Sequence, residues 1–215
     1  MPRGRPRAGE SAERRQAVLD AAYAVLVEQG YERTSMLAVA QRAGASKETL
    51  YSWFGSKAGL FAAVVQSEAA QTNAVVPDPA TGPPDDPRAG LVAMMTNLLT
   101  LLTSVRSVTL NRAAITDPDL AEVLLAKGRH RTGPLIAAHL EALMDAGVLR
   151  PADPETAFRT LYGLVVTDTQ IRVLLGEPAP DAGEVASQAE RGVDQFLALF
   201  ARQGPDVPRS SSHDG

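Results

Sequence analysis

Residues 35–54 read SMLAVAQRAGASKETLYSWF, a pattern that predicts two short helices joined by a tight turn. Gly44 can end the first helix because, without a Cβ, it tolerates the left-handed backbone that a helix stop often needs. Ser46 can then cap the second helix by accepting a hydrogen bond from an amide of its first turn. The first helix has an apolar face at three- and four-residue steps, formed by Met36, Val39, Ala40 and Ala43.

The second helix, residues 47–54, has one apolar side and a larger polar surface. Leu50 and Phe54 are spaced i, i+4, whereas Lys47, Glu48, Thr49, Tyr51 and Ser52 fall largely on the other sides. A short helix with a buried seam and exposed hydrogen-bonding side chains has the form that reads a DNA major groove. Taken alone, the same pattern also fits two ordinary core helices.

The residues that follow Phe54, GSKAGLFAAVV up to Val65, favour the DNA-binding interpretation over two ordinary core helices. Residues 11–72 closely resemble the N-terminal DNA-binding domain of the TetR family of transcriptional repressors. Leu37 and Ala45 depart from the family pattern, which more often has a polar residue and a valine there. The matching residues keep the family's order and spacing, and they are Gly30, Tyr31, Thr34, Ala40, Ala43, Gly44, Ser46, Leu50, Tyr51, Phe54, Ser56, Lys57 and Leu60.

The helix-turn-helix supplies the predicted DNA contacts. Lys47, Thr49 and Ser52 are expected at or near base edges, and Lys47 can donate to guanine N7 and O6. Ser46, which caps this helix, is also among the predicted DNA-binding residues, without an assigned role. The resemblance implies that the phosphate backbone, which fixes register without reading sequence, is held by Thr34, Tyr51, Trp53 and Lys57. Trp53 fits equally well as a core aromatic against the first helix.

The first ten residues, MPRGRPRAGE, are rich in proline, glycine and arginine and are not expected to fold alone. The Arg3–Pro6 segment resembles an AT-hook, an extended arm that lies in the A·T minor groove. A narrow minor groove concentrates negative potential, which attracts Arg3 and Arg5. The alternative is a disordered, solubilising tail.

Charge is unevenly distributed along the 215 residues. Residues 1–60 hold nine Lys/Arg and six Asp/Glu, a net of +3, whereas residues 61–215 hold twelve and nineteen, a net of −7. A basic N-terminal head and an acidic body are typical of a protein that binds the DNA phosphate backbone through its head alone. The absence of cysteine excludes disulfides and thiolate sites. Neither a secretory signal nor a membrane-spanning run is expected, and a cytoplasmic location is expected.

Five prolines in residues 73–87 mark a boundary that no helix should cross. Beyond it, Asp-Pro pairs at 86–87, 117–118 and 153–154 predict helix starts, because aspartate caps while proline occupies the first helical position.

The expected fold is all-α, and residues 87–202 weakly resemble an AefR-like effector domain. The predicted parts are an arm (1–10), a head (11–72, with the helix-turn-helix at 35–54), the effector and dimerisation body (87–202) and a tail (203–215).

The resemblance implies a small-molecule effector pocket walled by helices spanning 88–106, 118–144 and 154–175, the second interrupted at Gly133-Pro134. Each polar side chain on these helices could orient a ligand or could equally sit in solvent. The residues proposed for the pocket are Met94, Asn97, Leu98, Arg106, Arg112, Phe158, Tyr162 and Val165.

Two C-terminal helices, 154–175 and about 183–202, carry the widest apolar surface and are expected to form a homodimer. A single recognition helix reads too few bases to select one site in a genome, so a partner is needed. The proposed interface residues are Leu164, Leu174, Val193, Phe196 and Phe200.

No catalytic motif, metal site or cofactor motif stands out, and His130 and His139 are interpreted as solvated surface residues. The sequence therefore predicts a homodimeric repressor that binds a pseudo-palindromic double-stranded DNA operator and is released by a small molecule. The alternative is a helical ligand-binding or interaction protein whose head has lost DNA affinity.

Overall fold

The structure is a computed structural model that describes residues 8–77 and 85–202. Arg3, Arg5 and the tail from residue 203 lie outside the described residues. Within these ranges the chain is helical, and its one β feature is an isolated antiparallel bridge between Leu149 and Ala201. The fold is therefore all-α, as the sequence predicts.

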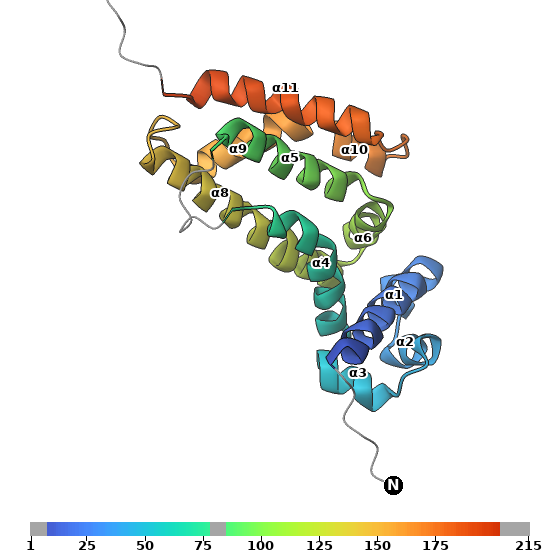
Figure 1. Ribbon diagram of the computed structural model, residues 1–215. Helices are drawn as coiled ribbons and strands as arrows, with labels where there is room; N and C mark the ends of the chain where they lie inside the picture. Colours follow the sequence, from blue (N-terminus) through green and yellow to red (C-terminus); the bar gives the residue numbers. More distant parts are fainter. Residues whose placement is uncertain (1–7, 78–84, 203–215) are drawn as a thin grey trace, which may run out of the picture.

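The head consists of α1 (Ala8–Arg33), α2 (Met36–Ala43) and α3 (Lys47–Phe54). Gly44 ends α2 with a left-handed φ of 62°, and the side chain of Ser46 caps α3, both as expected. Gly30 interrupts α1, because its φ of 77° and ψ of 165° are not helical, and a short further turn of helix follows it up to Arg33. Figure 1 shows the three helices packed together at one end of the molecule.

The helix α4 (Lys57–Ala74) connects the head to the body (Figure 1). Its first half completes the head core, where Phe61 is fully buried and meets the Tyr31 ring edge-on at 5.0 Å. Its second half belongs to the body, where the Thr72 hydroxyl donates to the Asn97 carbonyl. A single rigid helix thus contacts both parts.

The body is built from the helices that follow residue 85. Asp86, Asp117 and Asp153 each cap a helix whose first residue is proline, as the Asp-Pro pairs predict. No single described helix is long and apolar enough to cross a membrane, although α5 and α6, bent by 57°, pass that test as a pair. The elements are α5 (Pro87–Thr103), α6 (Val105–Thr116), α7 (Pro118–Leu124), the π-helical turn η2 (Leu125–Arg129), α8 (His130–Asp145), α9 (Pro154–Val166), α10 (Thr169–Leu174) and α11 (Ala182–Phe200).

The predicted interruption at Gly133-Pro134 is displaced one turn upstream. Pro134 lies inside α8, and the irregular segment is the π turn η2, which ends at Arg129. A proline ring in a helix clashes with the carbonyl four residues earlier, here that of His130. The backbone therefore departs from regular α geometry just before that position rather than at the proline itself.

The predicted single helix 154–175 is two helices, because the backbone breaks at Thr167. This residue has φ 48° and ψ −127°, a strained conformation for a β-branched side chain. Gln188 of α11 holds the break by donating to the Val165 carbonyl at 2.7 Å and to the Thr169 hydroxyl at 2.8 Å. The side chain that contacts the end of α9 comes from α11, so the sequence around Thr167 alone does not predict the break.

The helices α9 and α11 pack so closely that α11 needs glycine at position 192. A Cβ there would lie 2.5 Å from Val165 Cγ2 and 2.9 Å from the Leu164 carbonyl oxygen. The inward face of α11 also carries Val193, Phe196 and Phe200, which are 0%, 0% and 6% exposed in the single chain. These three side chains fill the protomer's own core, which corrects the expectation that they face a partner.

Candidate DNA-binding surface and ligand cavity

The helix α3 presents its polar residues on an exposed surface of the head. Leu50 is fully buried beneath the helix, while Ser46, Lys47, Tyr51 and Ser52 are exposed. Lys47 Nζ lies 5.6 Å from the centre of the Tyr51 ring, so these two side chains share one face. Thr49 is half-buried, with its hydroxyl 3.0 Å from that of Ser46. The fold brings these five polar residues together at the surface.

The side chains of three other residues predicted to contact DNA make contacts within the head itself. Thr34 is 3% exposed, and its hydroxyl donates to the Gly30 carbonyl at 2.8 Å, which corrects the expectation of a free phosphate donor. Lys57 Nζ donates to the Tyr31 carbonyl at 3.0 Å and lies 4.1 Å from the centre of its ring. Trp53 is half-buried, edge-on to Phe54 at 6.2 Å.

Two further charges bear on this surface: Arg15 of α1, which the sequence pattern did not single out, and Glu48 of α3 itself. The guanidinium of Arg15 lies 5.0 Å over the Phe54 ring at the end of α3, and the side chain is exposed. Glu48 sits in the first turn, where a hydrogen bond from its own amide and one from Ser46 lower the pKa of its carboxyl. The carboxylate therefore stays ionised and repels phosphate from its own side of the helix.

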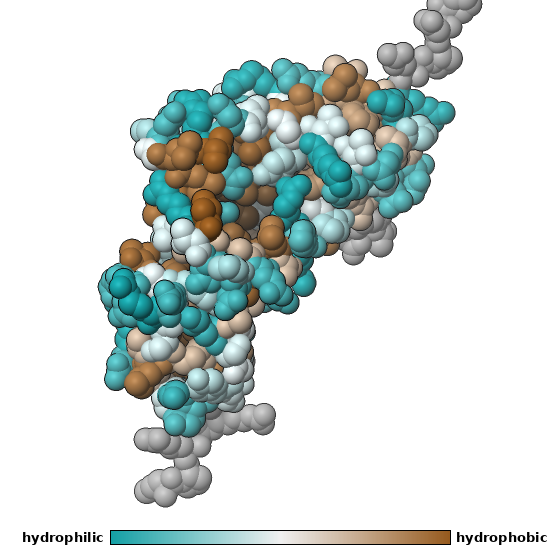
Figure 2. Space-filling model, turned by 180° about the vertical axis from the view of Figure 1, so that it is seen from behind, coloured by the Kyte–Doolittle hydropathy of each residue, from teal (hydrophilic) through white to brown (hydrophobic). Residues whose placement is uncertain are grey.

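The body holds a cavity of about 220 Å³ lined by residues of every element from α4 to α10. Figure 2 shows one face of the molecule, where hydrophobic residues gather over α6 and α10 and the surface beside them is hollowed. Of the predicted pocket residues, Leu98, Phe158 and Tyr162 line the cavity. Its other lining residues include Val65, Glu68, Leu101, Leu102, Leu110, Asn111, Leu124, Arg129, Thr132 and Gln170.

The remaining predicted pocket residues are placed elsewhere. Met94 and Val165 are fully buried in the body core, and Asn97 Nδ2 donates to the Ala93 carbonyl of its own helix. Arg112 binds the end of α10 by donating to the carbonyls of Leu174 and Val173 at 2.9 and 3.0 Å. A helical stripe shows which residues face inward, but not whether they meet a cavity or another side chain.

Polar side chains gather at the Tyr162 end of the cavity. The Tyr162 hydroxyl donates to Gln170 Oε1 at 3.1 Å, and burial raises the pKa of this hydroxyl although Arg129 opposes the shift. The Arg129 guanidinium lies 5.0 Å from the centre of the Tyr162 ring and 5.6 Å from that of Phe158. Sequence reasoning missed Arg129, because nothing local shows that the π turn points it at two aromatic rings.

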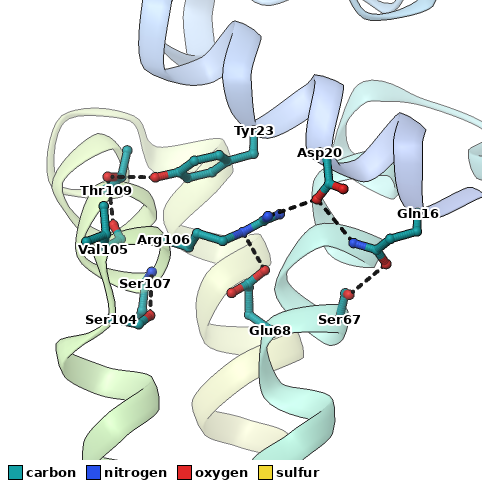
Figure 3. A network of polar contacts seen from close by, with 10 residues as sticks. All are labelled: Gln16, Asp20, Tyr23, Ser67, Glu68, Ser104, Val105, Arg106, Ser107 and Thr109. Atoms are coloured by element: carbon teal, nitrogen blue, oxygen red, sulfur yellow. Dashed lines mark hydrogen bonds and ion pairs between the residues drawn. The ribbon is translucent and has the colours of Figure 1, made fainter. Parts of the chain in front are cut away.

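Arg106 lies outside the cavity and joins it to the head (Figure 3). Its Nη1 is 2.8 Å from Asp20 Oδ1 on α1, and its Nε is 2.7 Å from Glu68 Oε1 on α4. The guanidinium also covers the Tyr23 ring at 4.6 Å. Burial raises the pKa of the Glu68 carboxyl, and Arg106 opposes that shift. Since Glu68 lines the cavity, one arginine links a cavity wall to the first helix of the head.

The fold and these surfaces define a helix-turn-helix DNA-binding protein whose helical body holds a ligand-sized cavity that opens to the surface. Residues 18–64 match the family of bacterial regulatory proteins named after TetR, and residues 89–202 match the C-terminal domain of the AefR-like transcriptional repressors. The chain belongs to the TetR family of transcriptional regulators.

Individual relatives agree with this assignment. YdeS of Bacillus subtilis (strain 168), described as an HTH-type transcriptional regulator, is 31% identical over 166 residues, covering 75% of this chain and 79% of YdeS. A TetR transcriptional regulator from Agrobacterium tumefaciens is 34% identical, with a TM-score of 0.69 over 88% of this chain and 95% of that one. The flavonoid-responsive regulator FrrA is 27% identical, with a TM-score of 0.68 over 90% of this chain and all of FrrA.

Proposed function

We propose that this protein is a cytoplasmic, homodimeric repressor that binds a pseudo-palindromic operator and releases it when a small molecule enters the body cavity. The observation that carries this proposal is the path of α4. Its first residue, Lys57, holds the end of α1, while Glu68, three turns later, lines the cavity. A ligand that displaces Glu68 acts on the same rigid helix that supports the head.

The ion pairs of Arg106 provide a second connection between the cavity and the head. Ligand binding beside Glu68 changes the surroundings of a carboxylate that Arg106 shares with Asp20. The arginine then redistributes between its two partners, and α1 moves relative to α6. Coupling of this kind requires that the ligand and the DNA prefer different arrangements of one element. Here that element is the junction of α1, α4 and α6.

On the DNA side, the proposal assigns base-edge contacts to Lys47, Thr49 and Ser52 from the exposed face of α3. Phosphate contacts come from Ser46 and Tyr51, with Arg15 and Trp53 at the far end of the helix, while Lys57 and Thr34 keep α3 correctly placed. Arg3 and Arg5 of the arm lie in the adjacent minor groove. FrrA, which is described as flavonoid-responsive, supports the proposal that a ligand controls the body.

Dimerisation is proposed through the outward face of α9 and α11, since their inward faces form the protomer core. Leu164 is half-exposed on α9, and Leu199 is 55% exposed on α11. A four-helix contact built on these residues would hold two heads at the spacing of successive major grooves, about 34–36 Å or a multiple of it. Leu174 is half-exposed on α10 and can extend this surface.

The test is selection of a duplex from a random DNA pool with the full-length protein, followed by titration of that duplex at several salt concentrations. A repressor of this design selects an inverted repeat, and log affinity falls with log salt by about 0.9 for each phosphate contacted. Failure to enrich any sequence, with weak binding to every duplex, would instead support the alternative of a ligand-binding protein that has lost DNA affinity.

A further inference from the structure

Two charged side chains line the cavity, and their surroundings differ. Glu68 already has a cation beside it, because Arg106 Nε is 2.7 Å from its carboxylate. Arg129 has no such partner, since no carboxylate of the described residues lies within ion-pair distance of its guanidinium. Arg129 is an exposed side chain, so water solvates its charge in the free protein, and among the described residues it is the cavity-lining charge left available to a ligand.

Two aromatic rings and a glycine determine where the Arg129 side chain lies. The guanidinium lies over the faces of Phe158 and Tyr162, where the ring quadrupoles attract a cation. Gly133 permits the Phe158 ring to lie there, because a Cβ at this position would be 3.1 Å from Phe158 Cε1. The π turn η2 ends at Arg129, and such turns are frequent at functional sites.

A second donor contacts the same tyrosine as the arginine. The Tyr162 hydroxyl donates to Gln170 Oε1, so the oxygen of this amide is engaged and its NH₂ group remains to donate. Arg129 and Gln170 both contact Tyr162, and both line the cavity. Together they offer a planar guanidinium and an amide NH₂ group, which match the two oxygens of a carboxylate.

Most of the remaining wall is apolar, although Glu68, Ser107, Asn111 and Thr132 also line the cavity. Leu98, Leu101, Leu102 and Leu110 face the interior with Val65. An engineered apolar cavity of about 150 Å³ holds one benzene ring, so about 220 Å³ has room for a substituted or fused aromatic ring or a medium-length alkyl chain.

We infer that the effector is a small organic carboxylate, whose charged end pairs with Arg129 and Gln170 and whose apolar body fills the leucine-lined part of the cavity. The inference rests on the proposed function in naming the ligand of that same cavity. A cationic effector fits less well, because it would face Arg129 and compete with Arg106 for Glu68.

Isothermal titration of the full-length protein with matched probes tests the inference. The probes are naphthoate, its uncharged analogue naphthamide, the cation naphthylmethylammonium, and octanoate as an alkyl carboxylate. We expect naphthoate to bind about tenfold more tightly than naphthamide, the size of one partly exposed charge-assisted contact. Arg129→Gln removes that preference, whereas Arg131→Gln, an exposed arginine outside the cavity lining, preserves it.

Several results would overturn the inference: equal affinity for naphthoate and naphthamide, tighter binding of the ammonium probe, a preference that survives Arg129→Gln, or no binding of either carboxylate. Titration of the selected duplex with each variant shows whether the ligand assignment or the proposed repressor function has failed. If Arg129→Gln binds DNA normally but keeps the carboxylate preference, only the ligand assignment fails. If the wild-type protein binds carboxylates but no DNA, the repressor proposal fails and the ligand assignment stands.

Discussion

Arg106 on α6 and Asp20 on α1 are joined by an ion pair of 2.8 Å, which ties the body to the head at a point distant in sequence. The arginine side chain is 30% exposed, and the Glu68 side chain that it also binds is 19% exposed. The Arg106–Glu68 pair is therefore less screened than the surface pair of Arg88 and Asp194, whereas Asp20, at 53% exposure, is as open to solvent as Asp194.

Replacing Arg106 with methionine keeps much of the length of the side chain and removes both ion pairs. We expect operator affinity to fall about three- to tenfold, in line with the loss of about 1 kcal/mol from a partly exposed pair. Arg88→Gln is the control and should leave DNA binding unchanged. In a double-mutant cycle with Asp20→Asn, the two effects should not add; additive effects would show that the pair does not connect head and body.

Lys47→Ala tests base reading by α3. Affinity for the selected duplex should fall by about 1–3 kcal/mol, with a smaller decrease on a scrambled duplex, because a base contact discriminates between sequences. Tyr51→Phe should weaken both duplexes similarly. Lys57→Ala should weaken both and also lower the thermal midpoint, since Lys57 binds the end of α1. Equal decreases on both duplexes for Lys47→Ala would remove it from the base-reading set.

Deleting residues 1–7 tests the arm, which carries three arginines. We expect weaker operator binding and a shallower dependence on salt, by about 0.9 in the log–log slope for each phosphate that the shortened protein no longer binds. The measurement is a salt series on duplexes with A·T-rich and G·C-rich flanks, and affinity should decrease more on the former. An unchanged slope and affinity would assign the arm no role in DNA binding.

Leu199→Asp places a charge on the outward face of α11 without entering the protomer core. Sedimentation should show dissociation to monomers at concentrations where the wild type is dimeric, and operator affinity should fall with it. Val27→Asp, an equally exposed valine on α1, serves as the control and should stay dimeric. Phe196→Asp should instead unfold the protomer, because Phe196 is fully buried. A dimeric Leu199→Asp variant would place the interface elsewhere.

His139 makes stability depend on pH. Burial lowers the pKa of this imidazole, and its Nε2 has no hydrogen-bond partner among the described residues. The unfolded chain therefore takes up the proton first, at a pKa of about 6.5, so stability is complete above that pH and falls as the pH drops below it.

The slope of that fall is at most about 1.4 kcal/mol per pH unit for one proton. His139→Leu should unfold at a higher temperature than the wild type at pH 5.5, with a smaller difference at pH 7.5. Thermal unfolding at both values measures this, and His130→Gln, at an exposed position, should behave as the wild type. An unchanged pH dependence in His139→Leu would exclude this histidine as the cause.

The sequence alone determined those features that depend on residues close together in the chain. Ser46 and Gly44 place the turn of the helix-turn-helix, and the Asp-Pro pairs begin three body helices. The i, i+4 spacing of Leu50 and Phe54 leaves Lys47 and Ser52 on the exposed surface of α3. Caps, turns and helical faces are local properties of a short segment, so their residues predict them directly.

Only the tertiary structure decided which inward-facing side chains meet a cavity, a neighbouring helix or the head. Met94 and Leu98 lie on the same helical stripe, yet only Leu98 lines the cavity. His139 is buried at 2% exposure although a surface position was expected, and Arg106 reaches Asp20 across 86 residues of sequence. These outcomes depend on how helices far apart in the chain pack together, because a side chain's partner is set by the neighbouring element and not by its own segment.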